Sequence, residues 1–121
     1  MPQSIFERYG GFAKIHDIVS VFYDKVMEHP ALSPYFAEID MDRLIMHQTR
    51  FIASVMGGPP SYTDEALRRA HAPYRITRAD FLAMIALVRL TLQEFGIDAV
   101  DIELVMEQIS RRESVIVSSG A

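Results

Sequence analysis

Three polar residues of this sequence have side chains that can bind a metal or stabilise a bound ligand. His71 ends a short helical pattern and lies two residues before Pro73, so its imidazole is expected at a helix terminus. Tyr23 and Gln48 fall on two other predicted helices, at positions on stripes that are otherwise apolar. A buried polar group without a partner costs on the order of 1–3 kcal/mol. Together the three residues are candidates for a site that binds a ligand.

Each of these residues also has an ordinary structural explanation. His71 can be an exposed histidine that interacts with the negative end of a helix dipole. Tyr23 can donate to a backbone carbonyl, and Gln48 can reach water at the edge of its helix face. His47 precedes Gln48 and shares a side with apolar residues one turn away, so it is either a ligand or a residue at the rim of the site. Taken one at a time, the structural explanations are preferred.

The composition excludes several kinds of site. The 121 residues include no cysteine, which excludes disulfides, thiolate zinc sites and iron–sulfur clusters. No apolar run approaches the roughly 20 residues that span a bilayer, and no signal-peptide pattern follows Met1, so we expect a cytoplasmic protein without a membrane span. A net charge of −4 without a long basic tract argues against a nucleic-acid partner. Motifs of nucleophilic, zinc-dependent and phosphate-binding enzymes are absent, so enzyme chemistry would require a cofactor.

Arginine is concentrated around His71. Arg68, Arg69, Arg75 and Arg78 account for four of the twelve Lys and Arg residues. Such clusters are usually solvated surfaces, although they also suit anionic groups of a ligand. Considered alone, the cluster favours a solvated surface.

Helices must position these side chains, and the pattern of apolar residues, caps and stop signals predicts a single all-α domain over residues 1–121. No segment shows the period-two alternation of a strand, and residues 1–3 and 118–121 are expected to be frayed. A tight turn or 3₁₀ segment is expected over residues 31–36. The predicted helices run from about Ser4 to Gly10, Phe12 to His29, Asp40 to Gly57, Thr63 to His71, Thr77 to Gly96, and from Asp98 onward.

The segment between residues 57 and 77 contains few apolar residues. It is therefore predicted to pack weakly on its own and to need a partner that orders it. Pro73 is expected to move Ala72 away from helical angles and so to end the short helix at His71.

Several short motifs follow one another in a characteristic order. They are F-E-R-Y-G-G at residues 6–11, Phe22-Tyr23, Pro34-Tyr35-Phe36, His47-Gln48 and Gly57-Gly58-Pro59 within residues 40–60, Tyr62-Thr63, Ala70-His71, Ile76-Thr77 and Phe81. As an ordered set they resemble the truncated haemoglobins, and most of all the first group of that family. The resemblance covers about residues 4–117.

The resemblance implies a two-over-two helical sandwich that encloses haem b, with His71 as the proximal iron ligand. The second ring nitrogen of His71 is expected to donate to a backbone carbonyl near Leu67, which fixes the orientation of the ring. Tyr23 and Gln48 are implied to hydrogen-bond O₂ on the distal side. The implied cofactor contacts are Phe36, Leu44, His47, Phe51, Ile76 and Phe81, with Arg68 and its neighbouring arginines, or Arg43, as partners of the propionates.

The implied function is binding of O₂, NO and CO. NO dioxygenation to nitrate is the candidate reaction, and it requires an external reductase because the chain has no flavin or nicotinamide site. A second hypothesis is a six-coordinate electron-transfer or peroxidase-like haem protein in which His47 is the distal iron ligand. A third is a helical interaction module without a cofactor.

Two features depart from the family pattern. Relatives often have glycine between the proximal histidine and the Ile-Thr pair, whereas this chain has Pro73-Tyr74-Arg75, so a different local path and haem exposure are expected. No histidine follows His71, so we do not expect covalent attachment of haem through a C-terminal histidine.

Overall fold

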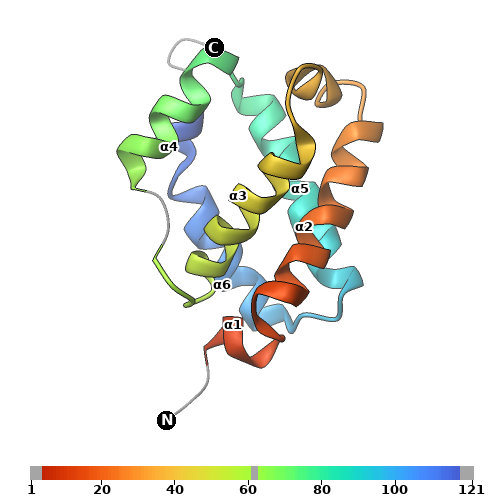
Figure 1. Ribbon diagram of the computed structural model, residues 1–121, viewed down its shortest axis with the longest axis vertical. Helices are drawn as coiled ribbons and strands as arrows, with labels where there is room; N and C mark the ends of the chain where they lie inside the picture. The colour runs from red at the N-terminus through yellow and green to blue at the C-terminus, as the bar shows by residue number, and fades with distance from the viewer. Residues whose placement is uncertain (1–3, 61–62, 118–121) are drawn as a thin grey trace.

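Helices form the regular structure of the computed structural model, which describes residues 4–60 and 63–117 (Figure 1). No β-strand occurs in these described ranges, so the all-α prediction is confirmed. The α-helices are α1 (Ile5–Arg8), α2 (Gly11–Glu28), α3 (Met41–Val55), α4 (Asp64–His71), α5 (Arg78–Glu94), α6 (Ala99–Ser110) and α7 (Glu113–Ile116), and the 3₁₀ helices are η1 (Ser33–Phe36) and η2 (Ala72–Tyr74).

Side-chain caps start four of the helices where the sequence predicted them. Ser4 forms a capping box with Glu7, and Asp40, Thr63 and Thr77 each accept a hydrogen bond from a backbone N–H of the following first turn. Each cap satisfies a donor that has no partner inside the helix. Local sequence chemistry therefore fixes the starts of α1, α3, α4 and α5.

The main core lies between two helix pairs. The α2–α3 pair packs over the α5–α6 pair, chiefly through α2 against α5, and Figure 1 shows these four helices crossing at the centre of the fold. The inward face of α2 is buried at Ile15, Ile18, Val19, Tyr23 and Val26, as its apolar spacing predicted, whereas Phe22 on the same stripe is only partly buried. None of the helices in the described residues is long and apolar enough to cross a bilayer.

A smaller apolar cluster lies apart from this core and holds α4 in place. It consists of Phe51 from α3, Leu67 from α4 and Val115 from α7. Figure 1 shows α4 at the side of the fold, where the end of the described chain packs against it. The sequence predicted a weakly packed segment here and did not predict α7. The partner that helps to order this segment is a part of the same chain that lies far away in sequence.

The connection after His71 differs from the prediction. Ala72 keeps helical angles, with φ −52° and ψ −43°, and begins the 3₁₀ turn η2, so the expectation that Pro73 would move Ala72 out of this region was wrong. Proline is tolerated in the first turn of a helix because its missing N–H is not needed there. The chain reverses instead at Arg75, which is the one non-glycine residue with positive φ, +50°, in the described part of the chain.

Candidate functional site

His71 lies half-buried at the C-terminal end of α4, and its ring is held by a single backbone contact. Its Nδ1 lies 2.7 Å from the carbonyl oxygen of Leu67, four residues earlier, as expected from the sequence. A carbonyl oxygen can only accept, so Nδ1 must carry the ring proton in this contact. Nε2 then keeps its lone pair and is available to a metal.

His71 has no partners with which to form a conventional metal site. Among residues 4–60 and 63–117, no group of three or more His, Asp or Glu side chains is arranged to hold a metal ion. Protein sites for bare zinc or calcium ions use three or more protein ligands. A single imidazole instead suits a metal that brings its other ligands with it, as iron does in a porphyrin.

Tyr23 supplies a buried hydroxyl from α2. The residue is 4% exposed, and its ring packs edge-to-face against Phe22 and Phe36, with ring centroids 4.8 and 5.7 Å away. Burial raises the pKa of Tyr23 well above its usual range, with no hydrogen bond or charge from the described residues contributing. The phenol therefore stays protonated and can serve as a hydrogen-bond donor at any physiological pH.

Gln48 and His47 are carried by α3 and are both half-buried, as is Leu44 one turn earlier. The sequence placed Leu44 and Gln48 on the inward face, but the residues that α3 buries fully are Thr49, Phe51 and Ala53. The predicted stripe is thus only partly covered by protein.

Other apolar side chains that the sequence placed inside are also incompletely covered. They pack on the main core yet keep part of their surface exposed, and they come from η1, α3 and α5. Partly exposed apolar surface on an inward face is what a large apolar cofactor would cover. These residues include Phe36, Leu44, Ile45, Met84, Ile85 and Val88.

The remaining predicted cofactor contacts are divided between the two clusters. Ile76 and Phe81 are buried in the main core, close in sequence to the η2 turn. Phe51 instead belongs to the smaller cluster with Leu67, so in this structure it supports α4. Contact of these three residues with a cofactor remains a prediction.

The arginines near His71 mostly have carboxylate partners. Arg68 and Arg69 are exposed and approach Glu65 at 3.3 and 4.0 Å, and Arg78 approaches Glu113 at 3.4 Å. Exposed pairs of this kind contribute little stability and exchange partners readily. Arg68 therefore remains a candidate for a ligand carboxylate, although it would have to leave Glu65.

One positioning contact was missed in the sequence. The Tyr35 hydroxyl donates to Asp80 Oδ2 at 2.5 Å, which ties η1 to the first turn of α5. A pairing between residues 45 positions apart in sequence has no local signal. The contact fixes η1, and with it the neighbouring Phe36 that packs on Tyr23.

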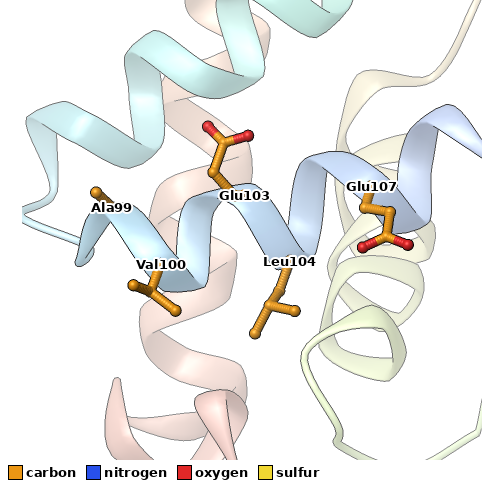
Figure 2. Close-up of a pocket in the computed structure, with 5 residues that line it drawn as sticks. All are labelled: Ala99, Val100, Glu103, Leu104 and Glu107. Carbon is orange, nitrogen blue, oxygen red and sulfur yellow. The ribbon is translucent and has the colours of Figure 1, made fainter.

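A separate hollow of about 400 Å³ lies on the outer face of α6 (Figure 2). Figure 2 shows Val100 and Leu104 one turn apart along the helix, and these side chains are 73% and 48% exposed. Its two acidic residues, Glu103 and Glu107, already pair with Arg89 and Arg111. The hollow contains none of the predicted site residues and offers no free acid or base.

Sequence comparisons with known proteins all point to globins. The family model described as bacterial-like globin matches residues 4–118. A group 1 truncated haemoglobin from Tetrahymena pyriformis is 34% identical over 82% of this chain and 83% of its own length.

Solved structures agree in fold. The Fe(III) form of truncated haemoglobin from Tetrahymena pyriformis superposes with a TM-score of 0.86 at 27% identity, covering 97% of this chain and all of the other. The 2/2 haemoglobin from Synechococcus sp. PCC 7002, solved with covalently attached haem, gives a TM-score of 0.83 at 26% identity, covering 94% and 98% of the two chains. These neighbours confirm the predicted two-over-two arrangement of helices.

Proposed function

This chain belongs to the truncated haemoglobin family of bacterial-like globins, and on that premise we propose that His71 is the proximal ligand of a haem iron. Proteins of this family bind haem and diatomic gases. The observation that carries the assignment of His71 is the 2.7 Å contact of its Nδ1 with the Leu67 carbonyl, because it leaves Nε2 free to coordinate. The other side chains of the structure fit such a group, since partly exposed apolar residues line the inward faces of η1, α3 and α5.

The acceptor of the His71 proton influences the chemistry that the iron performs. Haem supplies ferrous iron that binds O₂, NO or CO. A neutral carbonyl acceptor makes the imidazole less electron-donating than a carboxylate acceptor would. We therefore propose reversible gas binding as the basic activity.

Tyr23 and Gln48 act on the opposite side in this proposal. Hydrogen-bond donors beside a bound gas that carries negative charge would form charge-assisted hydrogen bonds. The Tyr23 hydroxyl is protonated at physiological pH, as an ordinary phenol is, and burial raises its pKa further. The two flanking aromatic rings restrict the positions that the hydroxyl can take. The half-buried amide of Gln48 provides the second donor.

NO dioxygenation is the reaction proposed for this site. The reaction would join NO and O₂ into nitrate, and bound haem would supply the one electron that this conversion consumes. An external reductase must return that electron, and we propose a flavin- or nicotinamide-dependent protein in this role. Tyr23 and Gln48 would favour the reaction by slowing the loss of O₂ before NO arrives.

The test is the absorption spectrum of purified protein with haem. Wild type is expected to show the Soret band of a histidine-ligated haem, and His71→Ala is expected to lose or shift it. His16→Ala, which changes an exposed histidine on α2, serves as the matched control and is expected to match wild type. If the wild-type protein takes up no haem, the proposal is wrong and a cofactor-free interaction module becomes the better hypothesis.

A second candidate is a six-coordinate haem protein with His47 as distal ligand. It is favoured by the half-buried position of His47 directly beside Gln48 on α3. In that case the ferrous, ligand-free spectrum is six-coordinate and His47→Ala converts it to five-coordinate. A six-coordinate spectrum that survives the substitution would rule out His47 as the sixth ligand.

A further inference from the structure

We propose that α7 sets the orientation of the His71 ring and that it acts through Leu67, with Val115 as the main positioning residue. The inference rests on the proposed role of His71 as an iron ligand. It concerns how the His71 ring is held in place, which membership of the family does not specify.

Leu67 connects the packing of α4 directly to the His71 ring. Its side chain is the only fully buried one in α4, and it packs with Phe51 and Val115. Its carbonyl oxygen is the atom 2.7 Å from His71 Nδ1. Since one residue makes both contacts, a displacement of α4 at Leu67 moves the acceptor of the ring proton.

No residue of α4 belongs to the main core, so α4 is held chiefly from the side of α7. Of the two apolar partners of Leu67, Phe51 is fixed within the long helix α3, whereas Val115 lies in a helix of four residues near the end of the described chain. Val115 is therefore the partner whose position depends on how well the short C-terminal helix is docked.

Arg112, directly before α7, holds that helix against α3. Its guanidinium carbon lies 5.4 Å from the centre of the Phe51 ring, and its Nη1 donates to the Gln108 carbonyl at 2.7 Å. Its Nε lies 3.8 Å from an oxygen of Asp64, at the start of α4. A guanidinium over an aromatic face is attracted by the ring, so this contact favours packing of the start of α7 against α3.

A second ion pair links α7 to the other end of the segment that contains His71. Glu113 approaches Arg78, the first residue of α5, at 3.4 Å. Residues 64 and 78 thus both lie next to α7 or to the residue before it. Because both ion pairs have an exposed partner, the restraint on α4 is assigned to the buried contact of Val115 with Leu67.

The experiment compares Val115→Ala with Val105→Ala in the haem-containing protein. Val105 is fully buried in the main core on α6, so its truncation serves as a control for general destabilisation. The readouts are the iron–histidine stretching band of the ferrous protein by resonance Raman, and the exchange rate of the His71 ring N–H by NMR in the CO complex. Neither readout depends on catalytic activity.

Val115→Ala is expected to shift or broaden the iron–histidine band and to make ring N–H exchange about tenfold faster. Val105→Ala is expected to change neither, even where it lowers Tm as much. Arg112→Gln, which removes the stacked charge without opening a cavity, is expected to act in the same direction but less strongly. Unchanged readouts in both Val115→Ala and Arg112→Gln would overturn the inference.

Backbone amide exchange separates this inference from the proposed function. Without haem, Val115→Ala is still expected to accelerate exchange across residues 64–71 relative to Val105→Ala. If the wild-type haem spectrum does not depend on His71, the proposed function fails, and this measurement still decides whether α7 holds α4. Equal exchange across residues 64–71 in the two variants would contradict the link between α7 and α4.

Discussion

The two sides of the proposed site are supported in very different ways. Tyr23 lies within the 18-residue helix α2, in the main core, and is flanked by two aromatic rings. His71 lies at the end of the eight-residue helix α4, which is attached through one buried leucine to a cluster of three residues. The proposed hydrogen-bond donor is therefore firmly packed, whereas the proposed metal ligand depends on a small number of contacts.

The difference suggests a division of roles. A donor that must point at a bound gas benefits from a fixed position, because a hydrogen bond weakens steeply when its angle changes. A ligand held by a short, lightly packed helix can be adjusted by changes far from the iron. Mutations on the two sides should therefore have different signatures: the rate of gas release on the Tyr23 side, and the ligand geometry on the His71 side.

The largest predicted effect is on the Tyr23 side. Tyr23→Phe should raise the O₂ dissociation rate about 10- to 100-fold, since one charge-assisted hydrogen bond contributes roughly 1.5–3 kcal/mol. Stopped-flow replacement of O₂ by CO measures this rate. Tyr9→Phe is the control, because that hydroxyl donates to Asp101 and lies outside the proposed site. An unchanged rate in Tyr23→Phe would mean that its hydroxyl points away from the gas.

A loss of stability is predicted when Asp101, which links α6 to Arg8 of α1 and to Tyr9, is replaced. Asp101 is 5% exposed and accepts hydrogen bonds from Arg8 Nη2 and the Tyr9 hydroxyl, both at 2.8 Å. Asp101→Asn should lower the free energy of unfolding at pH 7 by about 2 kcal/mol, because it breaks a partly buried charged pair. Urea denaturation measures the loss, and the iron–histidine band should stay unchanged.

The pH dependence of that loss follows from the pKa of Asp101. The hydrogen bond from Arg8, aided by Tyr9, lowers the pKa of Asp101 in the folded state. A lowered pKa contributes stability that is present above the unfolded value of about 3.9 and is lost as the pH falls through the folded value. The difference between wild type and Asp101→Asn should therefore shrink below about pH 4. A constant difference down to pH 3 would contradict this account.

The smallest predicted effect is on the His71 side and is stabilising. Arg75 has a left-handed backbone with φ +50°, which costs a residue with a Cβ about 1–2 kcal/mol. Glycine removes that strain but adds freedom to the unfolded chain, so Arg75→Gly should gain roughly 0.5 kcal/mol. Thermal unfolding of the haem-free protein measures it. Arg75→Asn should gain less, and a loss in both variants would show that the Arg75 side chain contributes more than the strain costs.

The sequence predicted most of the helices because the residues that start, end and orient a helix lie close together in the chain. The caps at Ser4, Asp40, Thr63 and Thr77 use residues within a single turn. The buried face of α2 follows a spacing of three and four residues. The contact of His71 with Leu67 spans only one helical turn, so it too could be predicted from the sequence.

Contacts between distant segments were not accessible in this way. Nothing in the sequence around Val115 indicates that it packs on Leu67, and nothing around Tyr35 indicates that it pairs with Asp80. The helical angles of Ala72 before a proline also departed from the local rule, because the 3₁₀ turn η2 continues directly from α4.

The sequence by itself determined that the chain is helical, where most of its helices start, and that a histidine ends a short helix, because these properties depend on neighbours within a turn or two. The tertiary structure decided which side of the site is rigid and which is lightly held. That outcome depends on Leu67, Phe51 and Val115 meeting from three separate helices. Apolar burial stabilises this cluster, and because that effect is non-directional, the spacing of apolar residues shows which of them are buried but not which partners they contact.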